Sequence, residues 1–139
     1  YVPQSLQLID DTILNNIAFG IEYKNIDYSN VKKILEIVQL KDFISKQKNG
    51  YNALVGESGV KISGGEKQRI GIARALYKNP DIIIFDEATS AIDEETEKRI
   101  FNEILKLKNK TIIFITHRKP STFICDKVFS LNNNFLSKI

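Results

Sequence analysis

Two adjacent carboxylates, Asp86 and Glu87, follow an apolar run that ends at Phe85. Such a run predicts a buried strand, and open α/β sheets do their chemistry at the carboxyl ends of their strands. Because neighbouring side chains of a strand point to opposite faces, the two acids cannot act as parallel ligands of one metal unless the chain bends there. We therefore expect the two carboxylates to have different tasks.

A glycine pair, Gly64-Gly65, stands at the start of a helical pattern upstream of these acids. A helix that opens on glycines offers bare backbone N–H groups and a positive end, both of which suit a phosphate. Ser63 and Glu66 also fit a capping box, in which each side chain satisfies the other residue's backbone N–H. Capping alone requires neither glycine, so a capping box and a phosphate contact both stay open on these residues alone, and the motif described below favours phosphate contact.

The pattern of the remaining chain predicts an α/β protein. Strands that alternate with helices indicate a mostly parallel sheet with helices on its faces. Asp93 is a predicted N-cap of the helix between the two apolar strands, and Ser29 is a predicted N-cap near the start of the chain. The expected helices cover about 12–19, 30–38, 40–50, 64–78 and 94–107, with a short helical or turn segment through Pro120; the expected strands cover 81–86, 111–115 and 127–131, with a turn at 132–134 and a returning strand at 135–136.

The segments ISGGEKQRIGIARAL, from Ile62, and DIIIFDEATSAID, from Asp81, resemble in order and spacing the signature motif and the Walker B segment of ATP-binding-cassette (ABC) ATPases. The resemblance implies a partial P-loop NTPase (RecA-like) sheet with helices, at about 63–139, and a small ABC helical subdomain, at about 5–62. No G-x-x-x-x-G-K-[ST] phosphate loop occurs in the sequence. We therefore expect residues 1–139 to be the C-terminal part of one ATP-binding domain, from the Q-loop onward, and to be inactive alone.

The resemblance also implies roles for single residues, with ATP and Mg²⁺ as cofactors. Glu87 matches the general base or water-polarising residue. His117, the only histidine, ends the run TIIFIT and matches the switch residue that contacts the γ-phosphate and orients Glu87. Asp86 and Gln4 match the residues that meet Mg²⁺. The positions that match nucleotide-contacting residues are Gln4, Ser63, Gly64, Gly65, Glu66, Ser90 and Asp93. By the resemblance, residues 63–66 of the signature motif and residues 90–93, which match the D-loop, act across a dimer.

Two branches of the family fit the motifs. The wording SGGEK at Ser63 is also found in the translation-factor type, which would act on a ribosome or another macromolecule. The segment VGESG at Val55 and the wording DEATSAID at Asp86 are instead similar to exporters. We expect the ATP-hydrolysing part of an exporter or flippase, on the cytoplasmic face of the cell membrane. Its expected partners are a second nucleotide-binding domain and the transmembrane domain of the same transporter.

Composition excludes several other classes of function. The 139 residues carry a net charge of only +3, and lysines often stand beside acids, so no basic stripe predicts nucleic-acid binding. The single cysteine, Cys125, excludes an internal disulfide and a cysteine-based zinc cluster. No apolar run reaches the roughly 18–20 residues that cross a bilayer.

Overall fold

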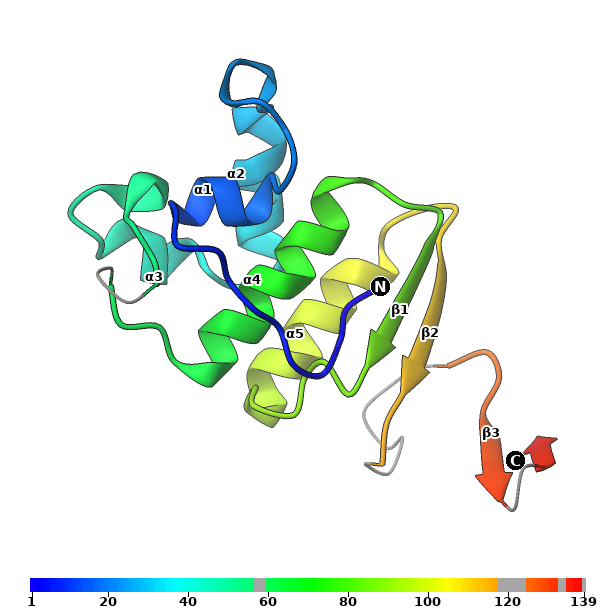
Figure 1. Cartoon of the computed structure of the whole chain (residues 1–139). Coiled ribbons are helices and arrows are strands. Elements are labelled where there is room, and N and C mark those ends of the chain that lie inside the picture. The colour runs from blue at the N-terminus through cyan, green and yellow to red at the C-terminus, as the bar shows by residue number, and fades with distance from the viewer. Residues whose placement is uncertain (57–59, 118–124, 133–134, 139) are drawn as a thin grey trace.

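The computed structural model describes residues 1–56, 60–117, 125–132 and 135–138. Figure 1 shows a group of helices beside a short parallel sheet, with the chain's first residues running between them. The elements are α1 (Ile13–Ile17), η1 (Tyr23–Asn25), α2 (Tyr28–Ile37), α3 (Lys41–Ser45), η2 (Gly50–Asn52), α4 (Gly64–Tyr77), β1 (Ile82–Asp86), α5 (Glu94–Leu105), β2 (Thr111–Ile115), β3 (Phe129–Asn132) and β4 (Phe135–Lys138).

The long helix α4 lies at the centre of the helical part, with α1 and α2 packed against it. Its start confirms the predicted capping box, because the Ser63 hydroxyl accepts the Glu66 N–H at 3.2 Å and the Glu66 carboxylate accepts the Ser63 N–H at 2.8 Å. At its other end, Asn79 adopts a left-handed φ of 48°, and Pro80 follows. Asparagine tolerates this geometry and proline cannot continue a helix, so both ends of α4 are set by local sequence.

The predicted start of α2 was wrong by two residues. Its N-cap is Asp27, whose carboxylate accepts the Asn30 N–H at 3.0 Å, and Ser29 lies inside the first turn. Aspartate and serine cap helices about equally well, so the choice between neighbouring caps depends on packing. In the structure, Val31, Ile34 and other apolar residues of α2 enter the core from this earlier start.

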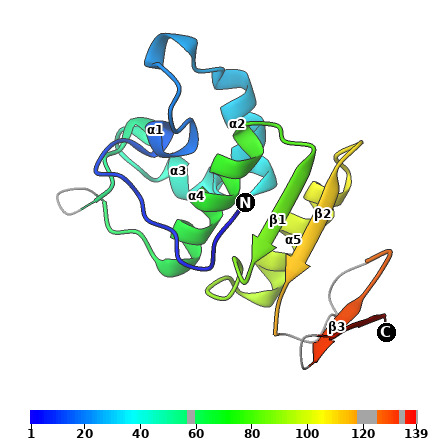
Figure 2. The same cartoon turned by 45° about the vertical axis from the view of Figure 1, so that its right-hand side comes forward.

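Strands β1 and β2 pair in parallel, with Ile82 opposite Thr111 and Asp86 opposite Ile115. The first residues of the chain extend this sheet, since Val2 bridges to Phe85 on the other edge of β1. Figure 2 shows α5 behind the two strands. Parallel pairing places the residues that follow both strands at one edge of the sheet.

A cluster of three phenylalanines joins α5 to this sheet. Phe85 of β1 stacks on Phe114 of β2 at 5.2 Å, and Phe101 of α5 meets both rings edge-on, at 5.3 and 4.6 Å. The prediction of a fully buried β1 was wrong at its start, because Ile82 is 56% exposed while Ile83 and Phe85 are buried. Within the described residues the strand is therefore half-buried, with alternate side chains in the core.

The last described elements, β3 and β4, form an antiparallel hairpin in a sheet of their own, which confirms the predicted return of the chain at 135–136. The expected segment through Pro120 and most of the expected turn lie outside the described residues. In the part of the chain that the structure covers, no helix is long and apolar enough to cross a membrane.

The one buried amide of α1, Asn16, ties this helix to the segment before it and to α4. Its Oδ1 accepts the Ile9 N–H at 2.9 Å and Nη2 of Arg74 at 3.0 Å. Its Nδ2 donates to the carbonyls of Ile9 and Thr12 at 3.1 and 2.9 Å. The Arg74 Nε also donates to the Asn16 carbonyl at 2.8 Å. Three separate segments of the chain therefore meet on this single buried residue.

Replacing Asn16 by leucine keeps the number and branching of the side-chain heavy atoms and removes all four side-chain hydrogen bonds. Because the Ile9 N–H and Nη2 of Arg74 lose their acceptor and the amide's place is buried, we expect a loss of about 2–4 kcal/mol in the free energy of unfolding. Asn15 is the matched control, since it is half-exposed and its amide bonds only Asp11. Urea unfolding of Asn15→Ala should show a loss of about 0.5 kcal/mol. Equal losses in the two variants would contradict this account of Asn16.

Candidate functional site

The carboxylate of Glu87 is held between two side chains from distant parts of the sequence. Nε2 of Gln4 donates to its Oε2 at 2.8 Å, and Nε2 of His117 lies 2.7 Å from its Oε1. Glu87 follows β1 and His117 follows β2, so the parallel pairing brings them to one edge of the sheet. Each carboxylate oxygen therefore has one donor when the imidazole carries its proton on Nε2.

The backbone of Glu87 has a left-handed φ of 48°, which is uncommon for a residue with a side chain. The sheet holds it there, because its N–H donates to the Ile115 carbonyl at 2.9 Å. The chain therefore bends directly after Asp86, so strict alternation does not extend to Glu87. Such strained residues concentrate at functional sites, where surrounding contacts enforce the geometry.

Asp86 accepts a hydrogen bond from a residue that sequence reasoning missed. The hydroxyl of Tyr1 donates to Asp86 Oδ2 at 2.6 Å. This hydrogen bond is the main reason why the pKa of the Tyr1 hydroxyl is raised; desolvation and the charge of Asp86 act in the same direction. No local sequence pattern indicates this contact, which arises because the neighbouring Val2 pairs with Phe85 of β1.

The predicted phosphate-contacting residues Ser63, Gly64, Gly65 and Glu66 form the first turn of α4 and its cap. Ser63 and Gly64 are exposed. The first N–H groups of a helix have no partner within the helix, so this end can receive an anion. The capping box places the Glu66 carboxylate within 2.7 Å of the Ser63 hydroxyl, next to that end.

The loop of residues 88–92 connects Glu87 to Asp93 and contains the predicted nucleotide-contacting residue Ser90. Asp93 caps α5 as predicted, because its carboxylate accepts the Thr96 N–H at 2.9 Å. That backbone hydrogen bond is the main cause that lowers the pKa of Asp93. The cap therefore fixes the end of the loop that lies farther from Glu87.

Gln68 is a second residue that sequence reasoning missed as part of the site. Its side chain is buried and bonds Ser90 and Ala91 of the loop. The signal was present in the spacing, since residues three and four apart on a helix share a face, and Gln68 lies at these distances from the glycine pair. The structure therefore joins the first turn of α4 and its cap, residues 63–66, to the loop that follows Glu87. We call residues 63–66 the signature turn.

Arg69, the next residue of α4, links the start of this helix to the segment that follows α2. Its guanidinium donates to the carbonyls of Gln39 and Gly65. Burial lowers the pKa of Arg69, while the nearby carboxylates of Glu66 and Asp93 oppose that shift. A positive charge is thus held beside the signature turn and the loop's cap.

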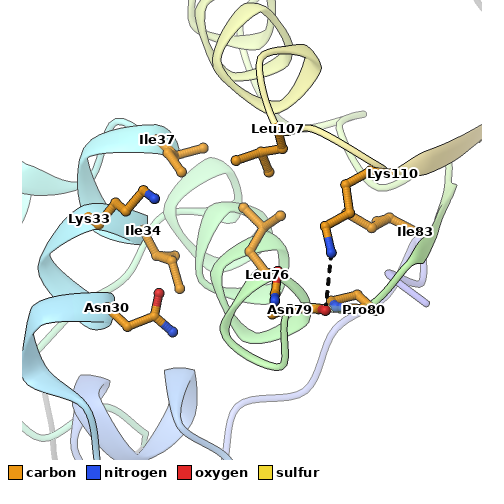
Figure 3. Close-up of a pocket in the computed structure, with 10 residues that line it drawn as sticks. All are labelled: Asn30, Lys33, Ile34, Ile37, Leu76, Asn79, Pro80, Ile83, Leu107 and Lys110. Atoms are coloured by element: carbon orange, nitrogen blue, oxygen red, sulfur yellow. Dashed lines mark hydrogen bonds between the residues drawn. The ribbon is translucent and has the colours of Figure 1, made fainter.

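A small pocket of about 70 Å³ lies away from these residues (Figure 3). It sits between α2, the end of α4 and the segments that enter β1 and β2, where Nζ of Lys110 donates to the Asn79 carbonyl at 3.2 Å. This is the amino end of the parallel strands, whereas Glu87 and His117 follow their carboxyl ends. Ligands of open α/β sheets bind at the carboxyl ends, so the pocket is not the candidate site.

The sequence is similar to a known protein family and to proteins of known name. The family model described as "ABC transporter" matches residues 1–90. The chain is 38% identical over 136 residues to the lactococcin-G-processing and transport ATP-binding protein LagD of Lactococcus lactis subsp. lactis, covering 98% of this chain and 19% of that protein. It is 41% identical over 128 residues to an ATP-dependent lipid A-core flippase of Aliivibrio fischeri, covering 91% of this chain and 22% of that protein.

A solved structure of a bacterial Atm1-family ABC exporter with ATP bound is similar to the chain, with a TM-score of 0.85 and 40% identity. The match covers 96% of this chain and 23% of the exporter chain. This likeness confirms the predicted α/β fold class. The chain spans about a fifth of the length of the relatives that it matches.

The left-handed backbone of Glu87 gives a test that is independent of activity. Glu87→Gly and Glu87→Ala both remove the carboxylate, but only alanine keeps a Cβ that opposes the positive φ. We expect the alanine variant to be less stable than the glycine variant by about 1 kcal/mol, measured by urea unfolding. If alanine proved equally stable or more stable, residue 87 would not hold this backbone conformation.

Proposed function

The chain belongs to the ABC transporter family, and we propose that it forms part of the ATP-hydrolysing subunit of an exporter or flippase. The observation that carries the proposal is the Glu87 carboxylate, held between Gln4 and His117 at the carboxyl edge of the sheet. The exporter and flippase relatives favour this branch over the translation-factor type. Residues 5–62 would form the helical subdomain, and residues 63–139 the signature helix and the RecA-like part.

Hydrolysis of a phosphoanhydride requires a positioned water molecule and neutralisation of charge more than covalent chemistry by the protein. Glu87 would accept a proton from that water or polarise it, as its two donors fix the direction of its carboxylate. His117 is 92% exposed, so one side of its ring stays open to a phosphate oxygen. Gln4 would respond to the occupancy of the same site, because it donates a hydrogen bond to Glu87.

The side-chain oxygens of Asp86 and Gln4 fit a Mg²⁺ ion whose remaining ligands are water and phosphate oxygens. Among the described residues, no three His, Cys, Asp or Glu side chains are grouped so that they could hold a metal alone. Magnesium in nucleotide sites takes one or two protein oxygens and completes its shell with water and phosphate oxygens. Asp86 and Gln4 supply such oxygens, and bound Mg²⁺ would neutralise charge on the phosphates of ATP.

A second nucleotide-binding domain is the proposed partner at the signature turn. Ser63, Gly64 and Gly65 would cover ATP held by the phosphate loop of that second domain, with Glu66 fixing the turn through the capping box. Ser90 and Asp93 belong to the loop that would cross to the same partner. The exposed helix end supports this role, because its N–H groups are available to an anion from outside the chain.

The proposed second partner is the membrane-spanning part of the same transporter, at the cytoplasmic face of the cell membrane. Ile9 and Phe19 are 38% and 42% exposed, although both lie next to the network around Asn16 and Arg74. The apolar residues of α1 between them, Ile13, Leu14 and Ile17, are fully buried. Two exposed apolar side chains beside a rigid buried network fit a surface that docks on another protein element.

The central test is ATP hydrolysis by the full-length protein. Glu87→Gln keeps the shape of the side chain but removes the base, so the ATPase rate should fall by about 100-fold or more while ATP binding is retained. Glu95→Gln on the exposed face of α5 is the matched control and should keep the normal rate. The 139-residue chain alone should not hydrolyse ATP. Near-normal hydrolysis by the Glu87→Gln protein would contradict the role of Glu87.

A second test addresses docking on the membrane-spanning part. In the full-length protein, Ile9→Ser should reduce the stimulation of ATPase by transported substrate much more than the basal rate, because the change affects the contact surface and not the core. Leu105→Ser is the control, since Leu105 is 41% exposed at the end of α5. A fall of several degrees in melting temperature with stimulation intact would instead identify Ile9 as a core residue.

A further inference from the structure

The side chain of Gln68 uses both ends of its amide on one loop. Nε2 donates to the Ser90 hydroxyl oxygen at 3.0 Å, and Oε1 accepts the Ala91 N–H at 2.8 Å. Gln68 is only 8% exposed, so water does not readily replace these bonds. A buried side chain that both donates to and accepts from two adjacent residues fixes the position and the direction of their backbone.

The glycine pair lets this loop lie directly on the first turn of α4. A Cβ on Gly65 would stand 2.9 Å from the Ala91 carbonyl oxygen, and a Cβ on Gly64 would stand 3.3 Å from the Ala91 Cβ. The first of these contacts is closer than backbone atoms allow. The glycines and Gln68 therefore form one surface on α4, and the loop of residues 88–92 is seated on it.

The same loop is connected to Glu87 by its own backbone. The Ser90 N–H donates to the Glu87 carbonyl at 3.3 Å, and the Ile92 N–H donates to the Thr89 carbonyl at 3.0 Å. A displacement of the loop at Ser90 would therefore be transmitted to Glu87. Its left-handed backbone leaves it little freedom to absorb such a displacement.

We propose that Gln68 is a positioning residue that couples the two ATP sites of the dimer, by holding the signature turn against the loop of residues 88–92 that directly follows Glu87. The inference rests on the proposed function, in which Glu87 serves one nucleotide and the signature turn covers the other. When Ser63 and Gly64 move on binding the second nucleotide, Gln68 moves with them. It displaces Ser90 and Ala91, and the loop in turn displaces Glu87. An apolar side chain of this size would be enough for packing alone. Packing would not need an amide whose nitrogen donates to Ser90 and whose oxygen accepts from Ala91.

The test compares variants of the full-length protein in steady-state ATPase assays. Gln68→Met keeps the length of the side chain and removes both hydrogen bonds. We expect kcat to fall by about tenfold or more, because small misplacements of catalytic groups are costly. The KM for ATP should stay within about twofold, since the groups that contact the nucleotide remain.

Two further variants separate positioning from stability. Ile72→Val, in a buried position on the same helix, should lower the melting temperature as much as Gln68→Met while keeping kcat. If Gln68→Met does not fold, Ser90→Ala removes one of the two bonds from the loop side and should lower kcat several-fold.

The inference is overturned if Gln68→Met, or Ser90→Ala in its place, lowers kcat no more than Ile72→Val does. Absence of ATPase activity in the unmodified full-length protein would instead refute the proposed function. A normal rate in Gln68→Met beside an active unmodified protein refutes only the role of Gln68.

Discussion

The close approach of the loop of residues 88–92 to the first turn of α4 is the contact on which the candidate site depends. It is possible because Gly65 has no Cβ, which would stand 2.9 Å from the Ala91 carbonyl oxygen, while a Cβ on Gly64 would make a tight contact of 3.3 Å with the Ala91 Cβ. The glycine pair thus meets two requirements, since it also leaves backbone N–H groups open at the helix end. A site assembled from α4 and the β1 edge therefore needs glycine at these positions for packing, whether or not a phosphate is bound.

Helix α4 carries a second set of contacts farther along, around Arg74. The guanidinium bonds the carbonyls of Asn16 and Gln7 and lies 5.0 Å from the centre of the Phe19 ring. Burial lowers the pKa of Arg74, and the acceptors around it compensate for part of that cost. The loop after Glu87 and the segment after Gln4 both bond to α4, and the signature turn is the first turn of this helix. A displacement of α4 would therefore move the signature turn and change its contacts with both segments.

The sequence predicted those parts of the structure that depend on local chemistry. The capping box at Ser63, the cap at Asp93 and the strands 82–86 and 111–115 all follow from motifs a few residues long. The N-cap of α2 shows the limit of such motifs. Ser29 was predicted and Asp27 is observed, because two residues that cap helices well lie two positions apart. The contact of Tyr1 depends on which segments meet in space, and no local pattern specifies that. For Gln68, the spacing from the glycine pair indicated only the shared helix face, and the loop that the amide bonds could not be predicted from it.

The backbone of Glu87 shows why the site residues are held ready before any ligand arrives. A left-handed residue with a side chain costs free energy, and here its N–H bonds β2 while its carboxylate accepts from Gln4 and from His117. Those contacts come from three different segments, so the strained conformation persists only when the sheet is formed. In the proposed function, an acid oriented in this way needs little reorganisation before it accepts a proton from water or polarises it. The bend after Asp86 therefore turns a strand that would place two acids on opposite faces into one that gives each acid its own set of partners.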